Sequence, residues 1–189
     1  MTPILHSPTG TPEQCLRFIL ARNHGEYTHW DIQNVILYTY FNYNEGIDPV
    51  MLVAQMIHET GNMTSWWSAR PRRNPAGIGV TGRAVPLNSA PAGHWAEHPD
   101  GTLHEGNSFC DWMNGIWSQV GRVLCYRFTQ SGGNAKQRFL MDMTNRDRPF
   151  PNQFRGKFNN WEDLNGRWAV PGTSYAQSII RIAEAIRRG

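Results

Sequence analysis

The run from Asp48 to Gly61 constrains the fold more than any other part of this chain. Asp48 is a favoured helix N-cap, Pro49 suits the first helical position, and Gly61 is a typical C-terminal stop. Between them, residues 50–57 read Val-Met-Leu-Val-Ala-Gln-Met-Ile and are apolar on nearly every side. Such a helix is covered from all directions in a core, and this one is far too short to span a bilayer. We therefore predict a central core helix over residues 49–60.

One carboxylate, that of Glu59, falls in the last turn of this predicted helix. Leu52, Met56 and Glu59 stand at positions i, i+4 and i+7, so the glutamate shares a stripe with apolar side chains. Burial and the negative end of the helix dipole both raise the pKa of a carboxyl group. A carboxylic acid that stays protonated near neutral pH can act as a general acid. The alternative is a glutamate at a frayed helix end that pairs with an arginine at position 70, 72 or 73.

Length and composition indicate one globular domain. The 189 residues are 40% hydrophobic and 12% aromatic, which argues against a disordered chain and allows a sizeable core. We expect residues 1–11 to form a mobile lead, followed by a single domain over residues 12–189. The net charge of +3 comes without a long basic run, so nucleic acid is not an expected partner. We expect no membrane span and no cofactor, and we expect a monomer.

Hydrophobic periodicity predicts further helices around this core, over about 12–22, 28–43, 108–128 and 134–143, and from Ser174 onward. The helix at Ser108 has Asp111 as its expected capping-box acid, and the last helix has the capping box Ser174-x-x-Gln177.

Helical periodicity disappears between residues 66 and 107. There, Pro99-Asp100-Gly101 is a strong turn signal between two short flanking runs. We predict an α+β fold, mainly α-helical, with a small β-hairpin lobe inserted after the central helix.

Cysteine and histidine patterns do not predict a metal site. The three cysteines lack metal-type spacing, and their odd number argues against a disulfide framework. His58-Glu59 begins like the zinc-protease motif HExxH, but position 62 is an asparagine. We therefore expect no bound metal, although a hairpin site that uses His94 and His98 is geometrically possible.

Three stretches of the chain, at residues 54–61, 74–79 and 167–175, together and in this order resemble the endo-β-N-acetylglucosaminidase domains of the lysozyme-like superfamily that are related to glycoside hydrolase family 73. Residues 54–61, Ala-Gln-Met-Ile-His-Glu-Thr-Gly, are similar to the family's helix that ends in Glu-Ser/Thr-Gly. Residues 74–79, Asn-Pro-Ala-Gly-Ile-Gly, are similar to its Asn-x-x-Gly-Ile turn, and residues 167–175 are similar to its late segment that carries a tyrosine. The resemblance covers roughly residues 28–188.

The resemblance implies a lysozyme-like fold and a hydrolase that cleaves peptidoglycan glycan strands after N-acetylglucosamine. Glu59 would be its general acid. Tyr175 would contact the substrate or orient Glu59, unless it is only a core residue of the last helix. The expected substrate-binding residues are Asn74, Gly77, Ile78 and Trp95.

Many members of this family use a second acid on the β lobe, and no motif selects one here. A turn explains Asp100 and a helix cap explains Asp111, which leaves Glu97 and Glu105. We expect Glu97 to be the partner of Glu59, at ~5–10 Å from it, the span of carboxylate pairs in glycosidases. The alternatives are that Glu97 is a solvated strand residue, and that the substrate's own 2-acetamido group replaces a second acid.

Two other functions are compatible with the same features. One is a lytic transglycosylase or muramidase that acts after N-acetylmuramic acid, and the other is a non-catalytic module that binds cell-wall glycan. The first residues lack the charged and apolar regions of a signal peptide. We therefore expect a phage-type endolysin, a virion-associated protein or an excised extracellular domain, acting on the cell wall.

Overall fold

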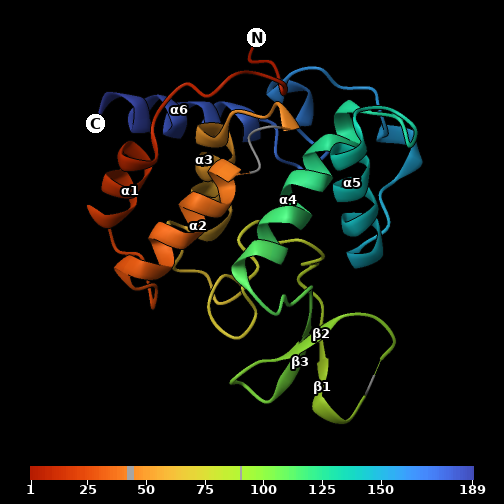
Figure 1. The fold of residues 1–189 in the computed structure, drawn as a ribbon. Coiled ribbons are helices and arrows are strands. Elements are labelled where there is room, and N and C mark those ends of the chain that lie inside the picture. The colour runs from red at the N-terminus through yellow and green to blue at the C-terminus, as the bar shows by residue number, and fades with distance from the viewer. Residues whose placement is uncertain (42–44, 90) are drawn as a thin grey trace.

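The protein has an α+β fold in which helices dominate (Figure 1). The computed structural model describes residues 1–41, 45–89 and 91–189 and places six α-helices and one three-stranded antiparallel sheet within them. None of the helices in these ranges has the length and apolar character needed to cross a membrane. The helices are α1 (Pro12–Leu20), α2 (His29–Phe41), α3 (Pro49–Thr60), α4 (Trp112–Arg127), α5 (Ala135–Asp147) and α6 (Tyr175–Arg188). The strands are β1 (Ala84–Pro86), β2 (Trp95–Glu97) and β3 (Thr102–Glu105).

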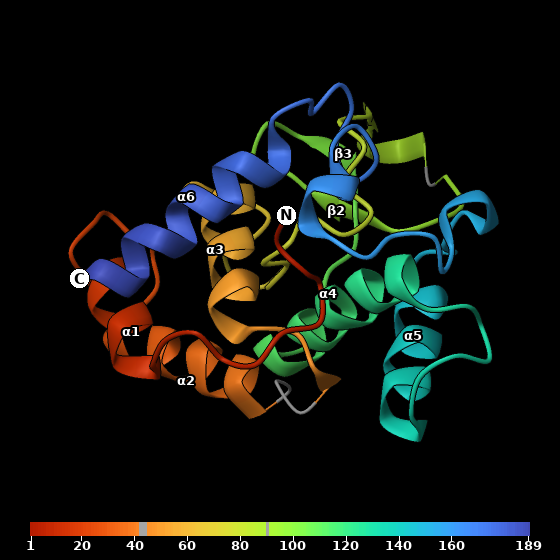
Figure 2. The same cartoon turned by 90° about the horizontal axis from the view of Figure 1, so that it is seen from above.

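The central helix is confirmed with its predicted bounds, because α3 runs from Pro49 to Thr60. The Asp48 side chain accepts a hydrogen bond from the backbone N–H of Val50, and Gly61 closes the helix in the left-handed conformation with φ of 56°. Every residue from 49 to 57 is buried. Helix α3 packs against α6 and α2, and Figure 2 shows α6 running across it. The end of α3 that carries Glu59 is therefore held rigidly inside the helical body.

The predicted hairpin is confirmed as β2 and β3, with the turn at residues 98–101 between them. The structure adds β1, which pairs with the other edge of β3 to give the order β1-β3-β2. A three-residue strand that ends in a proline has no periodicity that a sequence could reveal. The sheet lies at the end of the molecule opposite α6 (Figure 1).

One predicted helix start and one predicted helix cap are wrong. Helix α4 begins at Trp112 and not at Ser108, because Asp111 is itself the N-cap and accepts from the backbone N–H of Asn114. Helix α6 begins as expected after Ser174, but the Ser174 side chain makes no capping hydrogen bond. The α2 helix is described to Phe41, so the expected continuation to residue 43 lies outside the described residues.

The N-terminal segment is packed on the domain, which corrects the expectation of a mobile lead over residues 1–11. The side chain of Ile4 is fully buried in the main core. The backbone of Thr2 donates to the carboxylate of Glu162, and Leu5 forms a β-bridge with Ile47. Ile4 and the partly buried Leu5 both pack on the main core, and their burial fixes this otherwise polar segment.

We expect Asp48→Ala to destabilise the protein by ~3 kcal/mol, because it removes a helix cap and one partner of a buried ion pair. The buried Asp48 carboxylate also accepts from the backbone N–H and the hydroxyl of Thr9, and it pairs with Arg187 at 3.2 Å. Urea denaturation measures the loss. Asp111→Ala is the matched control, because Asp111 is an exposed cap, and it should cost only ~1 kcal/mol. Equal losses would contradict the role given to Asp48.

Candidate active site

Glu59 is half-buried at the end of α3, and its environment favours the protonated acid. Burial raises the pKa of its carboxyl group from the ordinary 4.5 to about 7. Hydrogen bonds from Tyr175 and Trp168 lower this pKa, but their effect is smaller than that of burial. A group with this pKa holds a proton in a large fraction of molecules at neutral pH. It can therefore give up that proton to a bound substrate and take one back.

A chain of hydrogen bonds from three helices positions this carboxyl group. Gln119 on α4 donates to Oε1 of Gln55 at 2.8 Å, and Gln55 on α3 donates to the hydroxyl of Tyr175 at 2.8 Å. Tyr175 on α6 then donates to Oε1 of Glu59 at 2.6 Å. The amide of Gln119 also donates to the backbone carbonyl of Leu52. This bond fixes which end of the Gln119 amide faces Gln55, and therefore in which direction the series of hydrogen bonds donates. Of the roles considered for Tyr175, the geometry therefore favours orientation of Glu59.

The two oxygens of Glu59 lie in different surroundings as a result. Oε1 accepts from Tyr175, whereas Oε2 lies on the side of Gly77, where a Cβ atom on that glycine would be 3.7 Å away. Gly77 has φ of 63°, a left-handed conformation that other residues adopt only with strain. This conformation lets the loop backbone run close to Oε2. The oxygen that Tyr175 leaves free is therefore the one that can carry the proton.

Glu59 lines a cavity of about 500 Å³. Its other walls come from the loop after α3, from the C-terminal end of α5 and from the segment that leads into α6, and they include Trp67, Asn74, Gly77, Thr81, Arg148, Trp168 and Val170. Glu59 is the only carboxylate in this lining among the described residues. The cavity thus offers one titratable acid, several polar groups and two indole rings to a bound molecule.

Asn74 holds the loop that forms this wall. Its buried side chain donates to the backbone carbonyls of Ile78 and Asn107 at 2.8 and 2.9 Å, and it accepts from the N–H of Ile78 at 2.9 Å. The structure therefore brings Asn74 and Gly77 to the cavity, as predicted from their turn. The Ile78 side chain packs with Ala76 and Phe109 in a small second core and borders an adjoining cavity.

That adjoining cavity, of about 260 Å³, shares Gly77, Arg148 and Trp168 with the first and is strongly basic. Arg122, Arg148 and Arg167 all border it, and none of them forms an ion pair within the described part of the chain. Burial, together with the neighbouring Arg148 charge, lowers the pKa of Arg122. A negatively charged group bound here would relieve this repulsion.

Glu97 and Trp95 do not line either of these cavities, which corrects two predictions. Glu97 is exposed, and both residues border a separate cavity against Trp66 on the lobe. Glu105, the other carboxylate left open by the sequence, does not line these cavities either, and its carboxylate accepts from Thr81 and pairs with Arg83. The physical reason is that strands β1 to β3 fold into a sheet of their own, whereas the loop before them forms the wall opposite Glu59.

Sequence reasoning missed three contributors to the site. Gln55 and Gln119 are fully buried, and Gln55 was visible as the one polar residue in an apolar run. Trp168 borders both cavities and stacks on the ring of Tyr175, with 6.3 Å between centroids. The chain has eight tryptophans, and nothing in the sequence set Trp168 apart from the others.

Comparisons of the chain with protein-family models, curated proteins and solved structures found no match. The membership of the lysozyme-like superfamily suggested by three sequence stretches therefore stays a prediction. The geometry around Glu59 is the basis for the function proposed below.

The raised pKa of Glu59 predicts a stability that falls as the pH rises. Between about pH 4.5 and 7 the folded protein holds a proton on Glu59 that the unfolded chain has lost, so folding is favoured at the acidic end. The range of about 2.5 pKa units corresponds to ~3 kcal/mol. Glu59→Gln should remove this dependence and gain up to ~3 kcal/mol over the wild type above pH 7.

Urea denaturation of both proteins across this pH range measures the difference. Glu97→Gln, which removes an exposed carboxylate from the lobe, is the matched control. If the difference in the free energy of unfolding between the Glu59→Gln protein and the wild type does not change with pH, Glu59 titrates as a solvated acid. The site would then lack the raised pKa on which its proposed chemistry depends.

Proposed function

We propose that the protein is a lysozyme-like peptidoglycan hydrolase in which Glu59 is the general acid for cleavage of a β-1,4 glycan bond. One observation carries the proposal. A carboxyl group with a pKa of about 7, oriented by Tyr175, lies in the wall of a 500 Å³ cavity. The order of the three sequence stretches that resemble glucosaminidase domains supports the same reading.

In this proposal Oε2 of Glu59 delivers its proton to the glycosidic oxygen. Protonation lets the C1–O bond break with an oxocarbenium-like transition state, and the leaving sugar departs as an alcohol. Tyr175 keeps its hydrogen bond to Oε1 throughout and stabilises the carboxylate that remains. Asn74 and Gly77 fix the loop against which the sugar lies, while the indole of Trp168 offers a face for stacking. The resemblance favours cleavage after N-acetylglucosamine.

The described lining of the cavity contains one carboxylate, which favours mechanisms that need no second acid. In a hydrolase, the substrate's 2-acetamido oxygen can attack C1 before water opens the resulting ring. The same observation favours a second candidate, a lytic transglycosylase. In that reaction the substrate's own 6-hydroxyl attacks C1 after N-acetylmuramic acid and leaves an anhydro end.

The basic cavity supports an acidic polymer as the substrate. Peptidoglycan carries carboxylates on its stem peptides, or on its lactyl groups where the peptides are absent, whereas chitin, built from the same type of glycosidic bond, is neutral. Such carboxylates would lie beside Arg122, Arg148 and Arg167, in the cavity that adjoins the one lined by Glu59. Arginine binds carboxylates in a planar, two-point geometry, so this cavity suits that role.

The direct test is lysis of purified cell walls in a zymogram. Glu59→Gln should lose at least ~10²-fold in activity, the usual contribution of a general acid, while its fold is kept. Glu97→Gln should retain the activity of the wild type because Glu97 lies outside the cavity. Mass spectrometry of the released fragments then gives the sugar at the new end, and an anhydro product would identify the transglycosylase.

Activity of Glu59→Gln within a few-fold of the wild type would remove Glu59 from the mechanism. If neither protein lyses walls while both sediment with them, the protein is a non-catalytic glycan-binding module.

Tyr175→Phe tests the positioning role. The variant removes a hydrogen bond that lowers the pKa of Glu59, so that pKa should rise and the alkaline limb of the activity profile should move to higher pH. We expect a lower turnover at the optimum and a stability loss of ~1 kcal/mol, from the unpaired Gln55 amide. A pH profile with unchanged limbs, together with a large fall in stability, would leave Tyr175 as a core residue only.

A further inference from the structure

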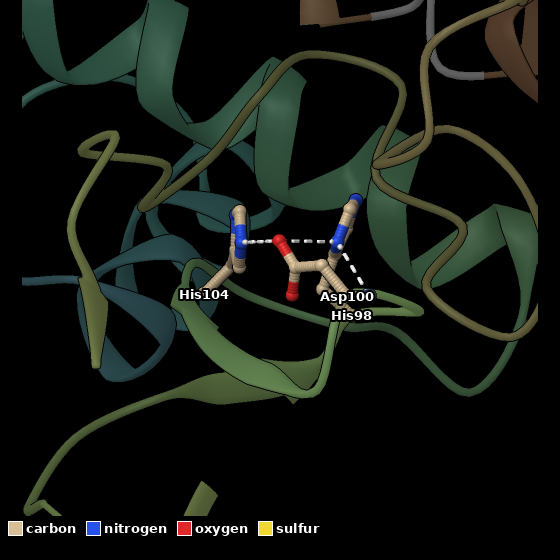
Figure 3. Close-up of side chains that lie close together, drawn as sticks. All are labelled: His98, Asp100 and His104. Atoms are coloured by element: carbon tan, nitrogen blue, oxygen red, sulfur yellow. Dashed lines mark hydrogen bonds and ion pairs between the residues drawn. The ribbon is translucent and has the colours of Figure 1, made fainter. Parts of the chain in front are cut away.

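A second cluster of chemically capable side chains lies on the β lobe, apart from the Glu59 cavity. His98, Asp100 and His104 come from the β2–β3 hairpin, and their ligand-type atoms all lie within 4.8 Å of one another. Figure 3 shows Nδ1 of His98 and Nε2 of His104 aimed at the same oxygen of Asp100. The sequence suggested His94 and His98 as a conceivable pair, but His94 is exposed and stands outside this cluster.

The two imidazole nitrogens and the carboxylate oxygen are close enough to repel each other unless a proton or a cation lies between them. Nδ1 of His98 is 3.0 Å from Oδ2 of Asp100, and Nε2 of His104 is 3.5 Å from the same oxygen. The backbone N–H of Asp100 points at Nδ1 of His98, at 3.3 Å, as it would toward a lone pair. Nε2 of His104 is buried and makes no hydrogen bond with the described residues. Either protons or a cation must therefore compensate this arrangement.

The two oxygens of the Asp100 carboxylate have different partners. Oδ1 accepts from the backbone N–H and the hydroxyl of Thr102, which closes the turn. Oδ2 takes no part in the turn and faces the two imidazoles. The turn is therefore complete without Oδ2, which is left for another partner.

Packing holds the two imidazoles ready for a shared ligand. Their rings stack with centroids 4.4 Å apart, and the ring of Trp66 lies edge-on against His98 at 4.7 Å. Both histidine side chains are more than two-thirds buried, whereas Asp100 is half exposed. Bound groups could therefore enter from the side of Asp100 without unpacking the lobe.

We propose that His98, Asp100 and His104 form a binding site for a divalent cation of the zinc class. Two imidazole nitrogens and one carboxylate oxygen are ligands that Zn²⁺ prefers, and hard cations such as Mg²⁺ select oxygen-only sets. Bonds of ~2.0–2.2 Å at tetrahedral angles put ligand atoms ~3.3–3.5 Å apart. The two imidazole nitrogens lie 3.0 and 3.5 Å from Oδ2 of Asp100, and all three ligand atoms lie within 4.8 Å of one another. The ion would link both strands of the hairpin through its turn, and water would complete its coordination. Its role would be to stiffen the lobe.

Zinc binding by the purified, chelator-treated protein tests the site without reference to catalysis. Competition with a chromophoric chelator near neutral pH should give one Zn²⁺ per chain, and Zn²⁺ should raise the melting temperature in a way that EDTA reverses. His104→Gln and Asp100→Asn should each weaken binding by at least ~10-fold, the lower end of what even an outer-shell change costs. His94→Gln, an exposed histidine of the same lobe, should bind as the wild type does.

Asp100→Asn also guards against a folding artefact, because its amide oxygen can keep both bonds to Thr102. Circular dichroism should show both cluster variants folded. Absence of saturable Zn²⁺ binding would overturn the proposal and leave a cluster held together by protons. Equal affinity in the wild type and in Asp100→Asn, or an equal loss in His94→Gln, would overturn it as well.

Discussion

A hydrogen bond of 2.6 Å joins Tyr175, the first residue of α6, to Glu59 in the last turn of α3, and the candidate site depends on it. It forms because α6 packs across α3, which brings the first turn of α6 against the last turn of α3. Behind it, Gln55 and Gln119 continue the chain of bonds through the core. Each side chain in this series donates to an acceptor, as buried polar groups usually do, although Oε1 of Gln119 is buried without a hydrogen-bond partner among the described residues. The outcome is a carboxyl group that is fixed in direction and still partly reachable from outside.

Irregular segments build the cavity around this acid on the rigid helical body. The loop held by Asn74 lies on one side, and the segment that carries Trp168 lies on the other. Loops give varied chemistry, whereas the helices below them give precision. The neighbouring basic cavity extends the same surface with three arginines, from α4 and from the segments after α5 and before α6, that form no ion pair with any described residue. A negatively charged polymer bound across both cavities would contact the carboxyl group of Glu59 in one cavity and the three arginines in the other.

The β lobe carries a separate piece of chemistry. Its sheet lies away from α6, and His98 and His104 pack against Trp66 beside Asp100. A cation there would change the rigidity of the lobe, whereas the proton on Glu59 belongs to the helical body. The two proposals therefore stand on different atoms, and each can be tested while the other fails.

The sequence by itself determined α3 and its acid, because caps, an apolar run and a stop residue are local signals that act within a few residues. It also determined the β2–β3 turn, for the same reason. Tertiary structure alone decided the partners. Tyr175 and Glu59 are 116 residues apart in the chain, and Gln119 reaches Gln55 across 64. Glu97 met the sequence criteria for a second acid, yet the sheet carries it to another face. Such placements depend on how helices and strands pack over long separations, and no local pattern encodes that.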